Sequence, residues 1–174
     1  MLSSFAVPYF YFYLNNCYVL SIEKVSCVFS ATRVTAKVAN DLAEAVGADV
    51  FEIQPAKRYT EADLNWKDEK SRSTLEMNDP AARPRIAAKL DHMDEYDVIY
   101  VGFPIWWYVA PRIINTFLES YDLTGKTVIP FATSGGSGVE KVNESLRESC
   151  TGAVLMQPHL LNDAKALNDL VQNT

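Results

Sequence analysis

The sequence predicts an α/β fold with one doubly wound, five-stranded parallel sheet and helices on both of its faces. The main support is that short apolar runs alternate with stretches of helical periodicity from residue 24 onward, a pattern typical of βαβ units. The chain has 174 residues and is 48% hydrophobic, which is enough for one sizeable core and too short for two domains. No internal repeat is present in the sequence.

The expected domain covers residues 23–174, preceded by an N-terminal extension, residues 1–22, that carries no charged residue. This extension lacks the basic start and the small-residue cleavage site of a secretory signal. Ser, Pro and Asn positions interrupt its apolar character, so a membrane span is not expected. Two interpretations stay open for it, an accessory strand or an over-extended start of the reading frame.

The first βα unit begins with residues 25–29, which are predicted to form a buried strand. Residues 30–35 are polar, and apolar residues then recur at helical spacing until Gly47, which stands where a glycine ends a helix. Residues 49–53 are predicted as the second strand. The unit therefore has the order strand, loop, helix and strand.

The middle of the chain has weaker patterns. Residues 57–78 are charged, contain Tyr59 and Trp66, and show no firm periodicity. Long loops are uncommon in compact domains unless they are functional or disordered, so this segment is expected to cover part of a site. Asp79 followed by Pro80 predicts a helix start, with an inner face formed by Ile86, Leu90 and Met93.

The remaining elements continue the alternation. Strands are predicted at residues 97–102, 126–133 and 153–156, and an aromatic loop at residues 103–110 precedes a helix that starts at Pro111. The S-x-x-E pattern at residues 137–140 has the form of a capping box, which predicts the start of another helix. Asn162 or Asp163 is expected to cap the last helix, with its inward positions at Ala164, Leu167, Leu170 and Val171.

Composition excludes several functional classes. Acidic residues outnumber basic ones by 22 to 16 without long runs of either sign, so the positive surface of a nucleic-acid-binding protein is not expected. The three cysteines form no CxxC pair, and both histidines are isolated. Neither a disulfide framework nor a metal site is therefore indicated, and a reducing, cytoplasmic location without membrane attachment fits best.

In an open doubly wound sheet, ligands bind beyond the carboxyl ends of the strands. Three predicted loops lie there, and the first, residues 30–35, offers the hydroxyls of Ser30, Thr32 and Thr35 at a helix start. Free N–H groups and the helix dipole meet at such a start and favour a phosphate group. Simple helix capping is the alternative. Residues 125–127 resemble part of a Walker A motif, but they precede a strand and lack the earlier glycine.

The other two loops add flat and flexible surfaces. Residues 104–108 carry two tryptophans and a tyrosine directly after a strand, and residues 133–138 are rich in glycine and hydroxyl groups. Aromatic runs more often belong to a core or an interface, and the glycine-rich segment has an ordinary turn as its alternative. Beside a phosphate-type loop, both favour a planar cofactor with a phosphate tail, because aromatic rings stack on flat ligands and glycine allows close backbone approach.

From residue 24 to the C-terminus, the sequence resembles the flavodoxin family, in particular a bacterial flavodoxin-like branch. The most specific motifs are residues 102–108, 117–119, 125–126 and 130–138. The resemblance implies a flavodoxin-like strand order 2-1-3-4-5, non-covalently bound FMN and redox chemistry. It implies that residues 30–35 bind the FMN phosphate and that the other two loops flank the isoalloxazine. The implied cofactor-binding residues are Ser30, Thr32, Arg33, Val34, Thr35, Pro104, Ile105, Trp106, Trp107, Tyr108, Thr133, Ser134, Gly135, Gly136, Ser137 and Gly138.

One position departs from the family pattern, which usually has Gly followed by Thr or Asn where this chain has Arg33 and Val34. If the backbone there needs a positive φ, arginine is strained; if it does not, the guanidinium is free to pair with the phosphate.

The leading hypothesis is an FMN oxidoreductase that transfers electrons with a partner protein or a small-molecule donor or acceptor, without a catalytic side chain. The alternatives are an NAD(P)H-dependent quinone or flavin reductase and a flavin-free interaction module on the same scaffold.

Overall fold

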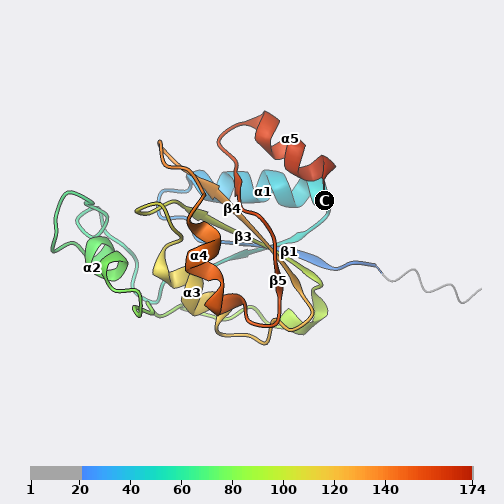
Figure 1. The fold of residues 1–174 in the computed structure, drawn as a ribbon, viewed down its shortest axis with the longest axis horizontal. Helices are drawn as coiled ribbons and strands as arrows, with labels where there is room; N and C mark the ends of the chain where they lie inside the picture. Colours follow the sequence, from blue (N-terminus) through green and yellow to red (C-terminus); the bar gives the residue numbers. More distant parts are fainter. Residues whose placement is uncertain (1–20, 174) are drawn as a thin grey trace, which may run out of the picture.

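The computed structural model describes residues 21–173 and contains a parallel sheet with strand order β2-β1-β3-β4-β5 (Figure 1). This confirms the predicted fold class and strand order. A sixth strand, β6, also pairs with β4. The strands are β1 (Lys24–Val28), β2 (Asp49–Glu52), β3 (Val98–Pro104), β4 (Thr127–Thr133), β5 (Val154–Leu155) and β6 (His159–Leu160).

β5 and β6 form one interrupted edge beside β4. Val154 pairs with Thr127 and His159 pairs with Phe131, so both strands run along the same neighbour. Pro158 lies between them, and a proline has no N–H to donate to a strand ladder. The single fifth strand predicted over residues 153–156 is therefore the first half of a longer, broken edge.

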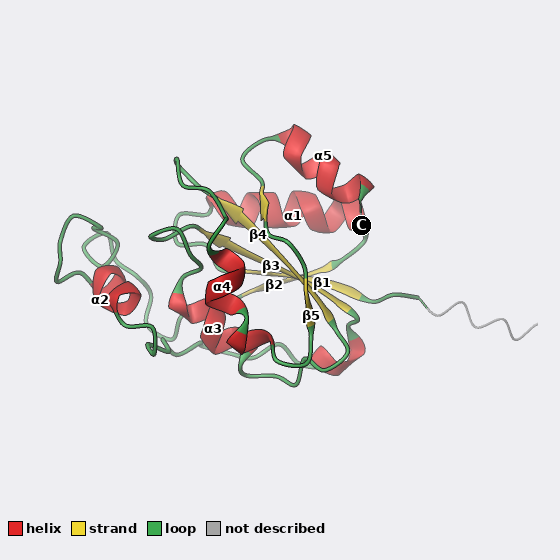
Figure 2. Cartoon of the chain, in the orientation of Figure 1, coloured by secondary structure: helices red, strands yellow, loops and turns green. Residues whose placement is uncertain are grey.

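Helices cover both faces of the sheet (Figure 2). On one side, α1 (Val34–Val46) and α5 (Ala164–Gln172) pack over a cluster that includes Leu42, Tyr100 and Phe131. On the other side, α3 (Arg112–Leu118) and α4 (Val142–Leu146) cover a larger cluster. Successive strand residues point to opposite faces, so Tyr100 belongs to the first cluster and its neighbours in β3 belong to the second.

The prediction for the middle of the chain was wrong in the placement of its helix. The expected helix after Asp79 does not form, and residues 79–92 contain no helix. Pro84 lies in its first turns, where proline is poorly tolerated beyond the first position. The segment instead pairs with the chain after β2, through Ala56 N to Arg85 O at 2.8 Å and Ala87 N to Gln54 O at 2.7 Å.

A helix does form inside the segment that was predicted as a loop. α2 (Arg72–Asn78) begins after Ser71, whose hydroxyl accepts a hydrogen bond from Thr74 N at 3.3 Å. This is an ordinary N-cap, which the missing apolar periodicity concealed. In Figure 2, α2 stands away from the sheet at one side of the molecule. Two short 3₁₀ helices complete the fold, η1 (Met93–Glu95) and η2 (Glu148–Cys150).

Two helix details near the C-terminus also differ. The capping box predicted at residues 137–140 is wrong, because α4 starts at Val142 and the Ser137 N–H donates to Ser134 Oγ within a turn. The last helix is capped by Asp163, one of the two expected residues, whose carboxylate accepts from Ala166 N at 2.9 Å. Ala164 is exposed, against expectation, and Ala166 packs on the core in its place.

Most of the predicted N-terminal extension, residues 1–20, lies outside the described residues. Across residues 21–173, none of the helices combines the length and the apolar character that crossing a membrane requires.

Candidate functional site

The three loops singled out in the sequence meet at the carboxyl edge of the sheet, and Thr133 at the end of β4 joins them. Its hydroxyl lies 2.9 Å from the hydroxyl of Thr35 in α1, and both side chains are buried. Its carbonyl accepts a hydrogen bond from Ile105 N at 2.9 Å. Thr35 and Thr133, which are 98 positions apart in the chain, therefore lie in contact at the base of the site.

A cavity of about 570 Å³ opens above this base. Its volume falls within the range of small-molecule sites. Its lining contains residues of all three loops and three that the sequence reasoning missed, Val38, Leu161 and Asn162. The predicted residues that line it are Thr32, Val34, Pro104, Ile105, Trp106, Thr133, Ser134 and Gly135.

The start of α1 supplies the polar end of the cavity. Arg33 is the N-cap residue, and no side chain caps the first turn of the helix. The free N–H groups at such an end attract an anion. Ser30 Oγ is buried and has no hydrogen-bond partner among the described residues, which leaves it available to a ligand. Ser30 and Arg33 do not line the central cavity; they line a smaller one of about 210 Å³, together with Tyr59. An uncapped helix start beside an unpaired buried hydroxyl fits a phosphate group.

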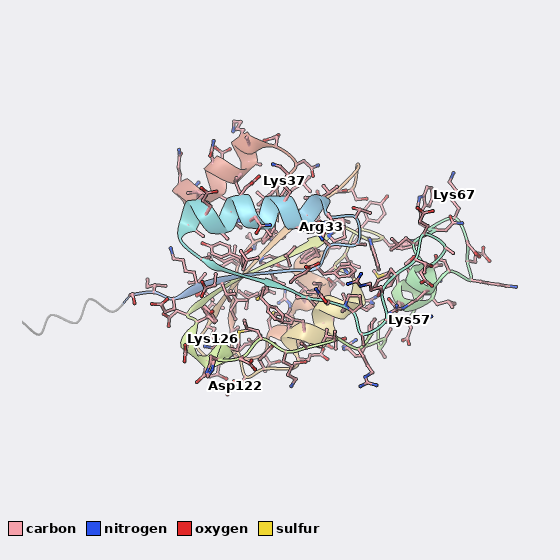
Figure 3. All side chains as sticks on the ribbon, turned by 180° about the vertical axis from the view of Figure 1, so that it is seen from behind. Arg33, Lys37, Lys57, Lys67, Asp122 and Lys126 are labelled. Carbon is pink, nitrogen blue, oxygen red and sulfur yellow. The ribbon has the colours of Figure 1, made fainter. Side chains whose placement is uncertain are left out.

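The Arg33 backbone lies in the left-handed region, with φ 66°. A residue with a side chain is strained there, whereas glycine is not. Of the two expectations for this departure from the family pattern, the structure fits the first, in which the backbone needs a positive φ and arginine is strained. Figure 3 shows Arg33 at the N-terminal end of α1, with Lys37 further along the same helix.

The aromatic segment divides into an inner and an outer part. Trp106 is partly buried and packs edge-on against Phe29 and Tyr59, with ring centroids 5.7 Å and 5.4 Å away. Trp107 and Tyr108 are 40% and 56% exposed. They occupy a tight two-residue turn with φ of 46° and 69°, closed by paired hydrogen bonds between Trp106 and Val109 of 3.1 Å and 3.0 Å. Only Trp106 of the three lines the central cavity.

The glycine-rich loop is more ordered than its composition predicts. Ser134 Oγ accepts hydrogen bonds from Gly136 N and Ser137 N at 3.1 Å and 2.7 Å. The side-chain amide of Asn162 bonds both to the N–H and to the carbonyl of Ser134, each at 2.9 Å. Three expected backbone donors are thus already engaged. Gly136 and Gly138 do not line the central cavity.

A second cavity, of about 400 Å³, adjoins the first and shares Ile105 and Trp106 with it. The outer aromatic residues and Ser137 line it on one side. Leu64, Trp66 and Ser73 line it on the other. The segment expected to cover part of a site therefore forms a wall of this second cavity.

A network around Tyr59 holds that wall to the sheet. The Tyr59 hydroxyl donates to Glu76 Oε2 at 2.5 Å, and the Arg72 guanidinium lies 4.0 Å from the centroid of the Tyr59 ring. Arg72 also pairs with Glu76, at 2.6 Å. Burial and the hydrogen bond to Glu76 raise the pKa of Tyr59 well above its ordinary value. Tyr59 is therefore a neutral hydroxyl that links α2 to Trp106.

The Walker-like segment lies away from this site, as its place before a strand predicted. The Lys126 ammonium donates to the carbonyls of Asp94 and Tyr96 at 3.1 Å and 2.6 Å. Figure 3 shows the two residues well apart, with Lys126 directly before β4 and Arg33 at the start of α1.

Comparisons with known proteins agree with the fold. A family model described as Flavodoxin matches residues 23–174. Crystal structures of candidate flavoproteins from Bacteroides uniformis ATCC 8492 and Bacteroides eggerthii DSM 20697 both align with a TM-score of 0.83. The first is 48% identical and covers 87% of this chain and 98% of its own. The second is 44% identical and covers 88% of this chain and 98% of its own.

A more distant relative has a named activity. It is FMN-dependent NADH:quinone oxidoreductase 1 from Xanthomonas euvesicatoria pv. vesicatoria (strain 85-10), 23% identical over 127 residues. The match covers 69% of this chain and 64% of that protein. The chain thus spans less than two thirds of the length of this relative.

Proposed function

The chain belongs to the flavodoxin family, and from this premise we propose that it is an FMN-binding oxidoreductase that transfers electrons through a non-covalently bound flavin. The observation that carries the proposal is the joining of the α1 start to the Trp106 loop through Thr133, below one cavity of about 570 Å³. Such a cavity offers a phosphate end and an aromatic wall to a single ligand.

The residues divide between the two ends of the cofactor. The uncapped N–H groups of α1 and the Thr32 hydroxyl would hold the phosphate in the central cavity. The unpaired Ser30 hydroxyl, which lines the smaller cavity at the same loop, would be a further donor to it. Trp106 and the Thr133–Gly135 segment would border the flat ring. FMN, when bound, supplies the electron-carrying chemistry, and the protein sets its position and surroundings. Electrons would be exchanged with a redox partner protein or a small-molecule donor or acceptor.

Ser30 gives a test with two separable readouts. Its hydroxyl has no partner in the described protein, so Ser30→Ala should leave the free energy of unfolding nearly unchanged. FMN affinity, measured by quenching of flavin fluorescence, should fall about tenfold, because a hydrogen bond to a charged group is lost. A matched control is Ser120→Ala, just beyond the end of α3, because the Ser120 hydroxyl donates to Thr116 O at 2.7 Å. It should lower stability by about 1 kcal/mol and leave FMN affinity unchanged.

Protein that is colourless as purified, and that gains no thermal stability from added FMN, would overturn the proposal. That outcome would favour the flavin-free interaction module. A loss of FMN affinity in the Ser120 variant equal to that in the Ser30 variant would instead overturn the placement of the phosphate.

A second function is favoured by the second cavity. An NAD(P)H-dependent quinone or flavin reductase needs room for a second flat molecule beside the flavin, and the cavity of about 400 Å³ shares Trp106 with the central one. The Xanthomonas relative, which carries such an activity in its name, supports the same choice. Rapid mixing of the FMN-loaded protein with NADH and NADPH separates the two functions. Direct bleaching of the flavin within seconds identifies a reductase, and no bleaching identifies a carrier that depends on a partner.

A further inference from the structure

A third cavity lies outside the proposed FMN site and carries positive charge. It has a volume of about 390 Å³ and is lined by the end of α2, the turn after β3 and the starts of α3 and α4. Its charged residues are Arg112, Lys141 and Glu144. The whole chain has a formal net charge of −6. This cavity, with two cationic side chains and one carboxylate, is locally positive instead.

Arg112 is an incompletely satisfied cation. Its Nε is buried and has no hydrogen-bond partner among the described residues. Nη2 makes a long contact of 3.4 Å to the Met77 carbonyl, and no carboxylate of the described chain forms an ion pair with it. Burial, and secondarily the charge of Arg83, lowers the pKa of the Arg112 guanidinium. An unpaired guanidinium in this setting is costly.

Two carboxylates act near Arg112 without forming an ion pair with it: Glu144 lines the same cavity, and the charge of Asp79 partly offsets the lowering of the Arg112 pKa. The neighbouring cation, Arg83, does have a carboxylate partner. Glu119 pairs with Arg83 through two contacts, Nε to Oε2 at 2.7 Å and Nη2 to Oε1 at 2.9 Å. It also accepts from Ser149 Oγ at 2.7 Å. Arg83 is thus satisfied by a fork-like pair, and Arg112 faces the cavity without an equivalent partner.

Lys141 is the second cation of the cavity. It forms no ion pair among residues 21–173, and its ammonium lies 5.9 Å from the centroid of the Tyr108 ring. Trp107 lines both this cavity and the second one, which in turn shares Trp106 with the central cavity. The cationic pair is therefore connected to the proposed flavin site by an aromatic wall.

From this arrangement we infer that Arg112 and Lys141 bind the phosphate or carboxylate group of the small molecule that exchanges electrons with the flavin. The flat part of that molecule would lie along Trp107 and Trp106. Arginine suits such an oxyanion because its planar fork donates two parallel hydrogen bonds. The inference rests on the proposed function and adds the chemical class of the electron donor or acceptor, a planar molecule with an anionic group.

The direct test is a calorimetric titration of the FMN-saturated protein with inorganic pyrophosphate and, separately, with malonate. Arg112→Gln should weaken binding about tenfold or more and Lys141→Gln about threefold, because each removes a charge-assisted contact. Glu144→Gln should strengthen binding severalfold by removing a like charge. Lys165→Gln is the matched control, because Lys165 is an exposed lysine on α5 that pairs with Asp169, and it should have no effect.

The two titrants distinguish the possible sources of the anionic group. Preference for pyrophosphate identifies a phosphorylated molecule, and preference for malonate identifies a carboxylate. Equal affinities in the unchanged protein and in all four variants, or no binding of either anion, would overturn the inference. If Arg112→Gln does not fold, Lys141→Gln and Glu144→Gln still decide it through their opposite signs.

A kinetic measurement links the cavity to electron transfer. Reduced FMN-loaded protein is mixed with a neutral benzoquinone and with a benzoquinone that carries a carboxylate. Arg112→Gln should slow the reaction with the charged quinone about tenfold and change the neutral one less than about twofold. Equal slowing of both would contradict the inference. If the protein binds no FMN, the proposed function fails, and the anion titration of the FMN-free variants still tests the cavity.

Discussion

Residues with positive φ occur at both ends of the sheet, but the two ends differ in which residue types adopt it. At the amino end, where the strands begin, positive φ is carried by glycine, at Gly47, Gly125 and Gly152. At the carboxyl end it is carried by Arg33 and by the Trp107–Tyr108 turn. Glycine adopts this conformation without steric cost, whereas other residues lose roughly 1–2 kcal/mol each.

The end of the sheet with strained non-glycine residues is the end at which the FMN site is proposed. His92, in the turn before η1, is the exception at the amino side, with φ 57°. The amino end otherwise has the residue that the backbone favours. The carboxyl end retains large side chains in strained turns beside the cavities, although glycine would relieve the backbone. Backbone strain of this kind concentrates at ligand sites.

The largest effect is expected at the amino end, for Gly152→Ala. Its φ is 85°, and an added Cβ would lie 2.7 Å from Thr124 Oγ1 and 3.2 Å from Thr124 Cα. Strain and overlap together should lower the free energy of unfolding by about 2–3 kcal/mol, measured by urea denaturation. Gly125→Ala, where the added Cβ meets no atom within 4 Å, should cost only about 1 kcal/mol. Equal costs would show that the overlap contributes nothing.

The next effect has the opposite sign and concerns Arg33. Arg33→Gly should raise the free energy of unfolding by about 1 kcal/mol by removing left-handed strain. Lys37→Gly, four residues further along α1, should lower it by about 1 kcal/mol, because glycine is unfavourable inside a helix. Both are measured by denaturation without FMN. Destabilisation by Arg33→Gly would mean that the comparison between the two ends is mistaken.

A similar effect, at the outer wall of the site, is expected for Tyr59→Phe. The change removes the hydrogen bond to Glu76 and should cost about 1 kcal/mol, with faster proteolysis within residues 57–78. Tyr96→Phe is the matched change at the amino end, where the hydroxyl donates to Asp49 at 2.8 Å in an exposed position. It should cost about half as much. The same protease sensitivity in both variants would contradict a role of Tyr59 in holding the wall.

The smallest effect depends on pH. Hydrogen bonds from Arg83, and then from Ser149, lower the pKa of Glu119 below its usual value of 4.5. A carboxyl group with a lowered pKa in the folded state adds stability above the pKa of the unfolded state, and this contribution disappears as pH falls through the folded value. Glu119→Gln should therefore cost about 0.5 kcal/mol near pH 7, after allowance for solvent screening, and less below pH 4.5. A difference that stays constant from pH 7 to pH 3 would exclude the charge as its source.

Local patterns were sufficient to predict most of the architecture. Strongly apolar strands such as β3 and β4 and the periodic helix α1 follow directly from side-chain spacing. Ser71, Pro84 and Pro158 account for the main errors, since each acts through one backbone hydrogen bond and not through periodicity. A single capping serine starts α2. Pro84 stands where the helix predicted after Asp79 would have its first turns, and no helix forms there. Pro158 separates β5 from β6, the strand that the prediction missed.

The site was predictable in its parts and not in its connections. Hydroxyls at a helix start and an aromatic run after a strand were visible in sequence. No local pattern indicated that Asn162 would form hydrogen bonds with Ser134. The same holds for Tyr59, which packs against Trp106 and donates a hydrogen bond to Glu76. These contacts join segments far apart in the chain, so only the folded sheet brings them together.

The central claim is that one cavity holds the phosphate of FMN at the start of α1 and its ring beside Trp106. The most direct measurement compares FMN with riboflavin, which has the same ring and no phosphate, by titrating each into the purified protein and following flavin fluorescence. The account predicts one FMN per chain, bound about 100-fold more tightly than riboflavin, because the helix start and Ser30 act on the phosphate. Equal affinity for the two flavins, or no binding of either, would contradict it.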